Sequence, residues 1–395
     1  MSSKLKKSAL RKSASQGLQL LGGISAAVFL RDFWQKKPLL IRNAITDFVG
    51  PLSMREILTL AGRDDAESRL ITRRGNTWEL QNGPFSRRAL SQPDDVSWTV
   101  LVHDVQHFSF EAHDLLAKFD FMPRARIDDL MVSYAVRGAG VGPHFDSYDV
   151  FLLQGKGKRR WQISGQRDLR LRPDSPLKIL SHFVPEDEYI LETGDMLYLP
   201  PGIAHNGIAE TACATWSIGF RAPSKQDLSV AFLDHVRDAI QLTGQYADAG
   251  LIVTTHPAQI DAVMQRRISR LLREVQNASR DVAAVRRFTG CYLTEPKSHV
   301  VFDTPHSTLA KGAFSKLAKR FGVELELKTR MLYDDQEVFL NGAARIPTPD
   351  LRIALRELAD KRSLAGSAIA RLEPKLGLAY LYECYREGVL AVARH

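Results

Sequence analysis

Short apolar runs dominate the middle of the chain, whereas the part that follows has longer stretches with helical spacing. Between Leu130 and Phe220 the apolar runs are brief and are separated by Gly and Pro pairs. Regularly spaced short strands with such turns are typical of an antiparallel sandwich or barrel. We therefore predict strands at Met131–Val136, Tyr148–Leu153, Arg159–Ser164, Met196–Leu199 and Ala214–Phe220.

The flanking regions predict different structure. Before the strand-rich segment we expect a short strand at Lys37–Arg42 and then helical and loop material up to about residue 125. Residues 224–288 have few strand signals, and the apolar residues from Ile260 to Val275 recur near a 3.6 period, which predicts helices. Residues 291–395 resemble a winged-helix module, with helices expected at Ala310–Phe321, 350–360 and 377–390 and strands at Val323–Met331 and Glu337–Leu340.

Composition places the chain among globular proteins, because 44% of its residues are hydrophobic and 25% are charged. The formal net charge is +9, but residues 1–42 contain nine Lys/Arg and one Asp. The basic character therefore belongs to an N-terminal leader and is a weak argument for a nucleic-acid-binding body. The leader resembles a signal peptide but lacks a small-residue cleavage site. Three widely separated cysteines form no CxxC pair, which fits a reducing cytoplasm.

Three residues of the strand-rich segment form a candidate metal site. In the run Gly142–Asp146, His144 and Asp146 are two residues apart, so on a strand both side chains project from one face. His205 follows a Gly-Asp turn, a short apolar strand and a Pro-Pro-Gly corner. Two histidines and one carboxylate are the facial triad of non-haem Fe(II) oxygenases. Each motif alone is common, but their joint occurrence in a strand-rich segment favours a metal site.

A second candidate lies in the hairpin after the first arm of this triad. Alternation places Arg159 on the apolar face with Trp161 and Ile163. A buried arginine requires an anion, and the distal carboxylate of 2-oxoglutarate would suit its two-pronged guanidinium. The alternatives are an acidic partner from a distant strand, a solvated turn, or Lys158 in this role if the register shifts by one residue.

These motifs, with the closing run Ser217–Pro223 and the early run Phe29–Arg42, resemble the cupin-like JmjC oxygenases. More narrowly, they resemble bacterial ribosomal oxygenases that hydroxylate an arginine of a large-subunit ribosomal protein. The resemblance implies a double-stranded β-helix barrel, a helical dimerisation region, a winged-helix domain, and a cytoplasmic homodimer. We accordingly expect a leader at 1–16, the oxygenase domain at 17–222, the helical region at 223–290 and the winged-helix-like domain at 291–395.

By position, the resemblance makes His144, Asp146 and His205 the iron ligands and Arg159 the anchor of 2-oxoglutarate, with Ser133 as a second contact. Fe(II) and 2-oxoglutarate are the implied cofactors. The sequence departs from the general cupin pattern, which often has Asn four residues after the last histidine. Here that position is Ala209, whereas Asn206 directly follows His205.

The substrate is suggested by charge. Residues 94–129 contain eight acidic and three basic residues, and a negative rim would attract a basic peptide and repel phosphate. Other hydroxylation targets of the fold, namely histidine, asparagine, lysine or a transfer-RNA base, remain alternatives, as does a non-enzymatic winged-helix regulator with a ligand-binding barrel. We expect a structural or docking role for the C-terminal domain and allow a non-specific RNA contact by the leader.

Overall fold

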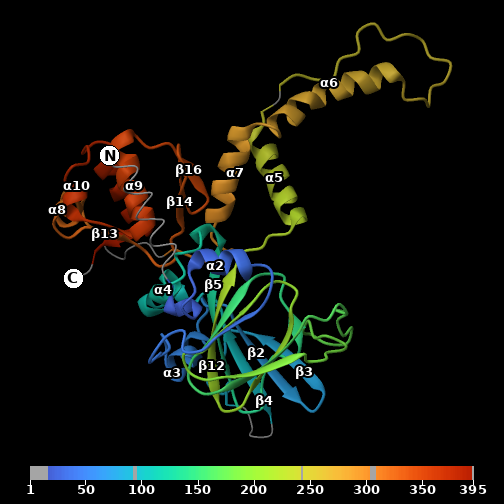
Figure 1. Cartoon of the computed structure of the whole chain (residues 1–395). Coiled ribbons are helices and arrows are strands. Elements are labelled where there is room, and N and C mark those ends of the chain that lie inside the picture. Colours follow the sequence, from blue (N-terminus) through green and yellow to red (C-terminus); the bar gives the residue numbers. More distant parts are fainter. Residues whose placement is uncertain (1–16, 92–95, 242, 303–307, 394–395) are drawn as a thin grey trace. The chain divides into compact units, whose positions relative to one another are not determined.

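The computed structural model describes residues 17–91, 96–241, 243–302 and 308–393. Two compact units divide the chain: one ends at Ala222 and includes Ser298–Val301, and the other comprises Pro223–Lys297 and the chain from Phe302 onward (Figure 1). The predicted leader, 1–16, lies outside the described residues.

Two antiparallel sheets form the first unit. The larger has the order β1-β10-β7-β12-β5-β4-β2-β3 and the smaller β6-β11-β8-β9. Apolar residues of β7, β8 and β10 pack between the sheets, so each sheet has one face toward a shared interior. The predicted double-stranded β-helix is confirmed, with two sheets that do not close into one ring. The strands are β1 Leu39–Ile41, β5 Ile127–Ala135, β6 His144–Phe145, β7 Val150–Gln154, β8 Arg159–Ser164, β9 Asp187–Leu191, β10 Met196–Leu199, β11 Ala204–Ala209 and β12 Cys213–Phe220.

Helices cover the other face of the larger sheet. Phe29 of α2 (Ala26–Asp32), Ile57 of α3 (Met54–Leu60) and Leu115 of α4 (Phe110–Ala117) belong to one apolar core with alternate residues of the strands. Ser53 and Glu56 form a capping box that fixes the start of α3. In β7 and β10 alternate residues belong to this core, and the residues between them pack in the interior between the sheets.

One region was predicted wrongly. Instead of only helical and loop material, residues 43–125 also contain three strands of the larger sheet: β2 Ser68–Arg74, β3 Thr77–Asn82 and β4 Ser97–Val102. In β3, which is the edge strand of the sheet, polar residues occupy most positions, so the alternation of apolar and polar residues is weak. Strand β4 pairs with β5, β2 pairs with β4, and β3 pairs with β2, and local sequence does not reveal these contacts.

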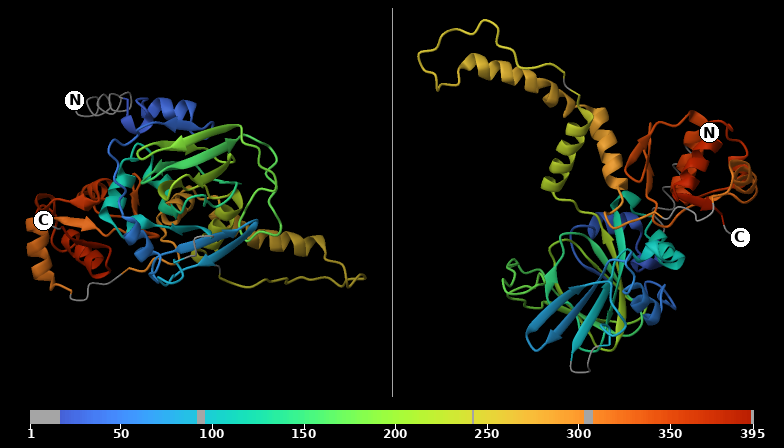
Figure 2. Two further views of the ribbon diagram at one scale, coloured as in Figure 1. Left: turned by 90° about the horizontal axis from the view of Figure 1, so that it is seen from below. Right: turned by 180° about the vertical axis from the view of Figure 1, so that it is seen from behind.

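The second unit begins with three helices, α5 Lys225–Ala239, α6 Ala262–Ala278 and α7 Val282–Thr294. Helices α5 and α7 lie side by side, and the ring centroids of Phe232 and Phe288 are 5.1 Å apart. Helix α6 extends beyond this pair together with the segment before it (Figure 2). The guanidinium of Arg267 donates to the backbone carbonyls of Ala247 and Ala249 and holds that segment against α6.

The winged-helix fold that was predicted for the C-terminal part is confirmed. Its helices are α8 Lys311–Phe321, α9 Pro349–Lys361, α10 Gly366–Ile369 and α11 Gly377–Arg386. The single strand expected over Val323–Met331 is wrong: the chain forms β13 Val323–Leu325, turns, and starts β14 Met331–Tyr333 in another sheet. The remaining strands are β15 Val338–Leu340, β16 Ala343–Arg345, β17 Ser363–Leu364 and β18 Leu390–Val392.

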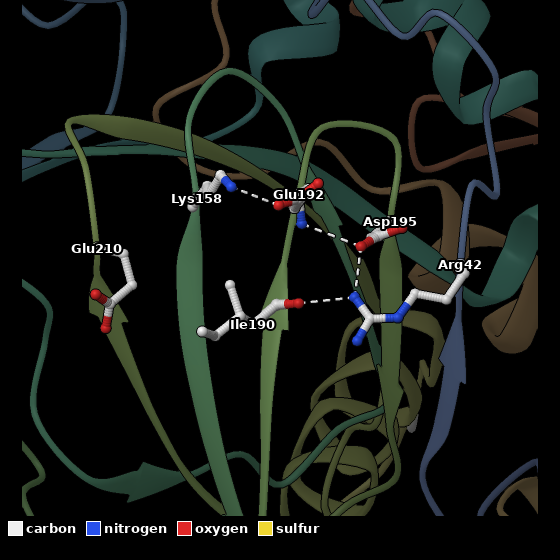
Figure 3. Close-up of a pocket in the computed structure, with 6 residues that line it drawn as sticks. All are labelled: Arg42, Lys158, Ile190, Glu192, Asp195 and Glu210. Atoms are coloured by element: carbon white, nitrogen blue, oxygen red, sulfur yellow. Dashed lines mark hydrogen bonds and ion pairs between the residues drawn. The ribbon is translucent and has the colours of Figure 1, made fainter.

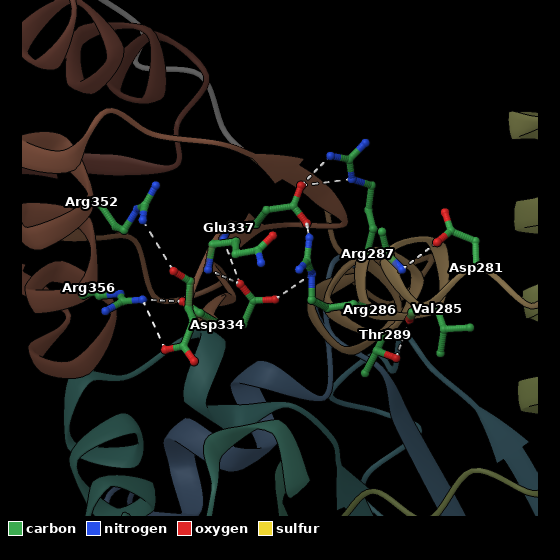
Figure 4. Close-up of polar contacts among 12 residues, drawn as sticks. Asp281, Val285, Arg286, Arg287, Thr289, Asp334, Glu337, Arg352 and Arg356 are labelled. Carbon is green, nitrogen blue, oxygen red and sulfur yellow. Dashed lines mark hydrogen bonds and ion pairs between the residues drawn. The ribbon is translucent and has the colours of Figure 1, made fainter.

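Ion pairs join α7 to the β14–β15 hairpin (Figure 4). The fully buried carboxylate of Glu337 lies 3.4 Å from an Nη of Arg286 and accepts a hydrogen bond of 3.0 Å from Nε of Arg287. Asp334, in the same turn, pairs with Arg286 at 3.2 Å. A buried carboxylate needs such partners, so these arginines fix the hairpin on the helix.

Within the described ranges, no helix is both long enough and apolar enough to cross a membrane.

Candidate metal and co-substrate site

The structure brings His144, Asp146 and His205 together between the two sheets. His144 pairs directly opposite His205 in the β6–β11 ladder, and their ring centroids are 4.2 Å apart. Nε2 of His205 lies 3.6 Å from a carboxylate oxygen of Asp146. One ligand atom from each of the three residues lies within 4.8 Å of the others. This arrangement lets three protein ligands meet on one side of a single ion.

Backbone carbonyls orient both imidazole rings. Nδ1 of His144 is 2.8 Å from the carbonyl oxygen of Gly142, and Nδ1 of His205 is 3.0 Å from that of Ile203. A carbonyl can only accept, so each Nδ1 carries the proton and donates it. Each Nε2 is thereby left with its lone pair for a metal, the usual outer support of a ligating histidine. The donor set therefore fits a divalent metal.

Burial keeps His205 neutral. The side chain is 3% exposed, and desolvation, followed by the neighbouring His144, lowers the pKa of His205 to about 4. Asp146 and the Ile203 carbonyl act in the opposite direction but do not compensate. The imidazole is consequently in its metal-binding form throughout the neutral and mildly acidic range.

We expect the metal-free protein to lose stability as the pH falls from 6.5 to 4. Because the pKa of His205 is about 4 in the fold and about 6.5 when unfolded, the unfolded chain binds more protons in this window. Protonation of this one group lowers the free energy of unfolding by about 3 kcal/mol over the whole window, and above pH 6.5 the group has no further effect. The free energy of unfolding, measured with urea at several pH values, should change less between pH 6.5 and 4 in His205→Asn than in the wild-type chain. An equal pH dependence in both proteins would contradict the prediction.

Arg159 is buried beside Ser133, in the same interior. The residue is 4% exposed, and one Nη donates to the Ser133 hydroxyl at 3.2 Å. Nε and the other Nη have no hydrogen-bond partner among the described residues. A buried guanidinium with two unsatisfied nitrogens is costly unless an anion joins it. This cationic position therefore fits a carboxylate group of a co-substrate.

Lys158, the alternative to Arg159, lies outside the interior. Its side chain is half exposed and pairs with Glu192 at 2.5 Å. Both line a surface pocket of about 520 Å³ in which the other cation is also paired, since Arg42 donates to Asp195 at 2.6 Å (Figure 3). The pocket lacks a free cation for a dicarboxylate, and the geometry favours Arg159.

Two residues near the triad, Gly207 and Tyr148, were not predicted from the sequence. Gly207 lies opposite Trp161, and a Cβ at that position would be 2.7 Å from the indole ring. Tyr148 hydrogen-bonds Asp146, and its pKa is raised by burial and then by the charges of Asp146 and Asp129. Neither role could be read locally, because the first depends on cross-strand register and the second on a loop conformation.

The two positions that depart from the cupin pattern, 206 and 209, lie on opposite faces of β11, because side chains alternate along a strand. Asn206 points away from the triad and donates to Gln162 at 3.2 Å. Ala209 is buried in a small cluster with Cys213. Neither residue touches a triad side chain in any described contact, so the missing asparagine leaves the histidine supports unchanged.

The fold and the site together define a cupin-type oxygenase, and comparisons with known proteins agree. Residues 114–228 match the JmjC domain model and residues 276–391 match the ROXA-like winged helix. The chain is 31% identical over 340 residues to the ribosomal protein uL16 3-hydroxylase of Escherichia coli (strain K12), covering 85% of this chain and 89% of that protein. The chain therefore belongs to the JmjC-domain ribosomal oxygenases, as the sequence motifs predicted.

Three further similarities support this membership. A probable ribosomal oxygenase of Haemophilus influenzae is 40% identical over 210 residues, which is 52% of each chain. The structure of YcfD, a ribosomal oxygenase from Escherichia coli, superimposes with a TM-score of 0.79 at 28% identity and covers 94% of this chain and 98% of that one. A structure of the same protein in complex with cobalt and 2-oxoglutarate gives a TM-score of 0.77 at 29% identity, with 92% and 97% covered.

Proposed function

We propose that this chain is an Fe(II)- and 2-oxoglutarate-dependent hydroxylase that acts on an arginine side chain of a large-subunit ribosomal protein. The observation that carries the reaction class is that the triad and Arg159 lie in one interior, where two nitrogens of the buried guanidinium have no hydrogen-bond partner in the part of the chain that the structure describes. The hydroxylase name and the 2-oxoglutarate complex of the similar proteins support the same reaction.

His144, Asp146 and His205 would hold the metal, while Arg159 and Ser133 would bind the distal carboxylate of 2-oxoglutarate. When bound, the metal and 2-oxoglutarate supply dioxygen activation, so that one oxygen atom enters a C–H bond and the other enters succinate, with release of carbon dioxide. The chain contributes two fixed imidazoles, a cationic anchor, and apolar walls such as Trp161 and Ile163 that exclude water. These groups fix the geometry of the reactants, which is the protein's share of the catalysis.

A cationic substrate side chain suits the surroundings of the triad. The carboxylate of Asp129 lies near Gly219, where a Cβ would be 3.0 Å from its oxygen and 4.0 Å from the Tyr148 ring. Asp128 and Asp146 add negative charge beside Tyr148. A guanidinium could therefore be stabilised close to the metal ligands. Of the acidic residues predicted to form the rim, Glu111, Asp114 and Asp120 are exposed, Asp104 is buried, and Asp94 and Asp95 lie outside the described residues.

The experiment is mass spectrometry of ribosomal protein uL16 after incubation with the purified chain, Fe(II), 2-oxoglutarate and oxygen. We expect a gain of one oxygen atom on one arginine and an equivalent of succinate. Intact-mass comparison of ribosomal proteins from cells with and without the gene checks the same modification in vivo. Modification of another residue type would replace the arginine assignment, and absence of any change would exclude the proposed function.

We further propose that the chain is a homodimer through the region 223–290. Helix α6 has an apolar face, with Ile268 42%, Leu271 49% and Leu272 51% exposed, and such a surface is typical of a buried contact. Light scattering should show a dimer that Leu271→Glu dissociates, whereas Arg270→Glu, a charge change on the same helix, should leave it intact. A monomeric wild-type chain would exclude this proposal.

The predicted domain division at 16, 222 and 290 is also a proposal. The last boundary falls within α7, and the winged-helix match begins at residue 276, so limited proteolysis should decide where the domain starts. We propose a cytoplasmic location, which cell fractionation tests. A contact between the basic leader and RNA would appear as salt-dependent binding that is lost on deletion of residues 1–16.

A further inference from the structure

The three triad residues differ in how the fold supports them. Asp146 is held by the Pro-Pro-Gly corner, because the N–H of Gly202 donates to its backbone carbonyl at 2.8 Å. His205 lies in β11, which is paired along its length with β8. His144 belongs to β6, which has only two residues and follows a glycine-rich loop. The orientation of His144 therefore depends on what holds this loop.

Two side chains from distant segments pack against the loop at Gly142. A Cβ built on Gly142 would lie 3.2 Å from Cζ2 of Trp78 and 3.1 Å from Cδ1 of Ile179, so both side chains occupy the space beside its Cα. Gly142 has a φ of +83°, which other residues rarely adopt. Its carbonyl accepts the hydrogen bond from Nδ1 of His144. A shift at Gly142 would consequently turn the imidazole.

The two contacts have different origins. Ile179 belongs to the β8–β9 connection, where the N–H of Leu180 donates to the carbonyl of Pro143 at 2.8 Å and ties that connection to the loop. Trp78 lies on β3, the edge strand of the larger sheet, opposite Arg73 of β2. The guanidinium of Arg73 lies 5.3 Å from the Trp78 ring centroid. The indole is thus held between a cross-strand cation and the backbone of the loop.

We propose that Trp78 is a positioning residue for the metal: through Gly142 it fixes the His144 ring so that Nε2 can bind. The inference rests on the proposed function only in so far as the triad binds a divalent metal. It gives the β2–β3 hairpin a role in the site, since this hairpin otherwise only extends the sheet edge. Loss of a group that hydrogen-bonds a metal ligand, here the Gly142 carbonyl, typically changes metal affinity 10- to 100-fold. Because Trp78 acts through this carbonyl, we expect its removal to give an effect at the lower end of that range.

The test is titration of the full chain with Co(II), followed by its visible absorption, without co-substrate or turnover. Trp78→Ala should weaken the Co(II) Kd about tenfold and alter the absorption bands, while Trp78→Phe should restore most of the affinity because a ring still contacts Gly142. Glu79→Ala is the matched control, since the next residue on the same strand is exposed and should leave the Kd unchanged. A lower melting temperature with an unchanged Kd would overturn the proposal.

A double substitution tests whether Trp78 acts through His144. In the His144→Ala background, Trp78→Ala should change the remaining Co(II) affinity less than about twofold, because coupled residues are not additive. A tenfold weakening of Co(II) binding in that background would show that Trp78 does not act through His144 and would overturn the proposal. If Trp78→Ala fails to fold, Ile179→Ala removes the other contact with Gly142 and should weaken Co(II) binding in the same direction. A wild-type chain without Co(II) binding would instead exclude the triad itself.

Discussion

Replacing His144 by alanine should abolish 2-oxoglutarate turnover, with a loss of at least about three orders of magnitude in kcat/KM. The substitution removes one of three protein ligands at a centre that must hold metal, co-substrate and dioxygen together. We expect Co(II) affinity to fall as well, because only two metal ligands, Asp146 and His205, remain in the variant. Succinate formation and Co(II) titration are the measurements.

The matched control is His182→Ala, which removes an exposed histidine from the β8–β9 connection. Its turnover and Co(II) affinity should equal those of the wild-type chain. His144→Ala should keep its fold, because the imidazole is only partly buried. Turnover retained in His144→Ala would exclude this residue as a metal ligand, whatever the other variants show.

Replacing Arg159 by methionine should raise the KM for 2-oxoglutarate about 100-fold or more. The two unsatisfied nitrogens could form two charge-assisted hydrogen bonds to one carboxylate, each worth about 1.5–3 kcal/mol. Methionine retains apolar contacts in the interior but supplies no donor. The KM for 2-oxoglutarate and its binding to the Co(II)-loaded chain measure the effect, while Co(II) affinity itself should be unchanged.

The melting temperature of Arg159→Met distinguishes an arginine that binds the co-substrate from one that stabilises the fold. In the absence of ligands Arg159 is a buried cation with one hydrogen bond, so its replacement by an apolar side chain should leave the melting temperature equal or higher. Lys158→Met is the control, since this exposed lysine pairs with Glu192 and should not alter the KM. An unchanged KM in Arg159→Met with a raised one in Lys158→Met would transfer the role to Lys158.

Local sequence pattern predicted the strands β5, β7, β8, β10 and β12 and the direction of several side chains. In β8 the buried residues Arg159, Trp161 and Ile163 alternate with the half-buried Arg160 and Gln162, as the pattern predicted. The side-chain period of a strand is two, so the face of a residue follows from its neighbours once the strand is identified. The spacing of His144 and Asp146 was informative for the same reason.

Other features depend on segments that are far apart in the sequence. The strands β2 to β4 were missed because their conformation comes from strand pairing: β4 pairs with β5, β2 with β4, and β3 with β2. The split of Val323–Met331 into two strands of different sheets likewise depends on partners elsewhere, β18 and β15. A one-dimensional pattern reports how polar a position is, but it does not report which strand lies beside it.

By itself, the sequence determined the class of fold, the three candidate metal ligands and the inward arginine, because these follow from short-range periodicity and residue chemistry. The tertiary structure decided which groups support them: the carbonyls that leave each Nε2 free, the contact of Arg159 with Ser133, and the packing of Trp78 on Gly142. Arg159 and Ser133 are 26 residues apart and Trp78 and Gly142 are 64 apart. The geometry of these contacts is set by strand register and close packing, which operate only in the folded chain.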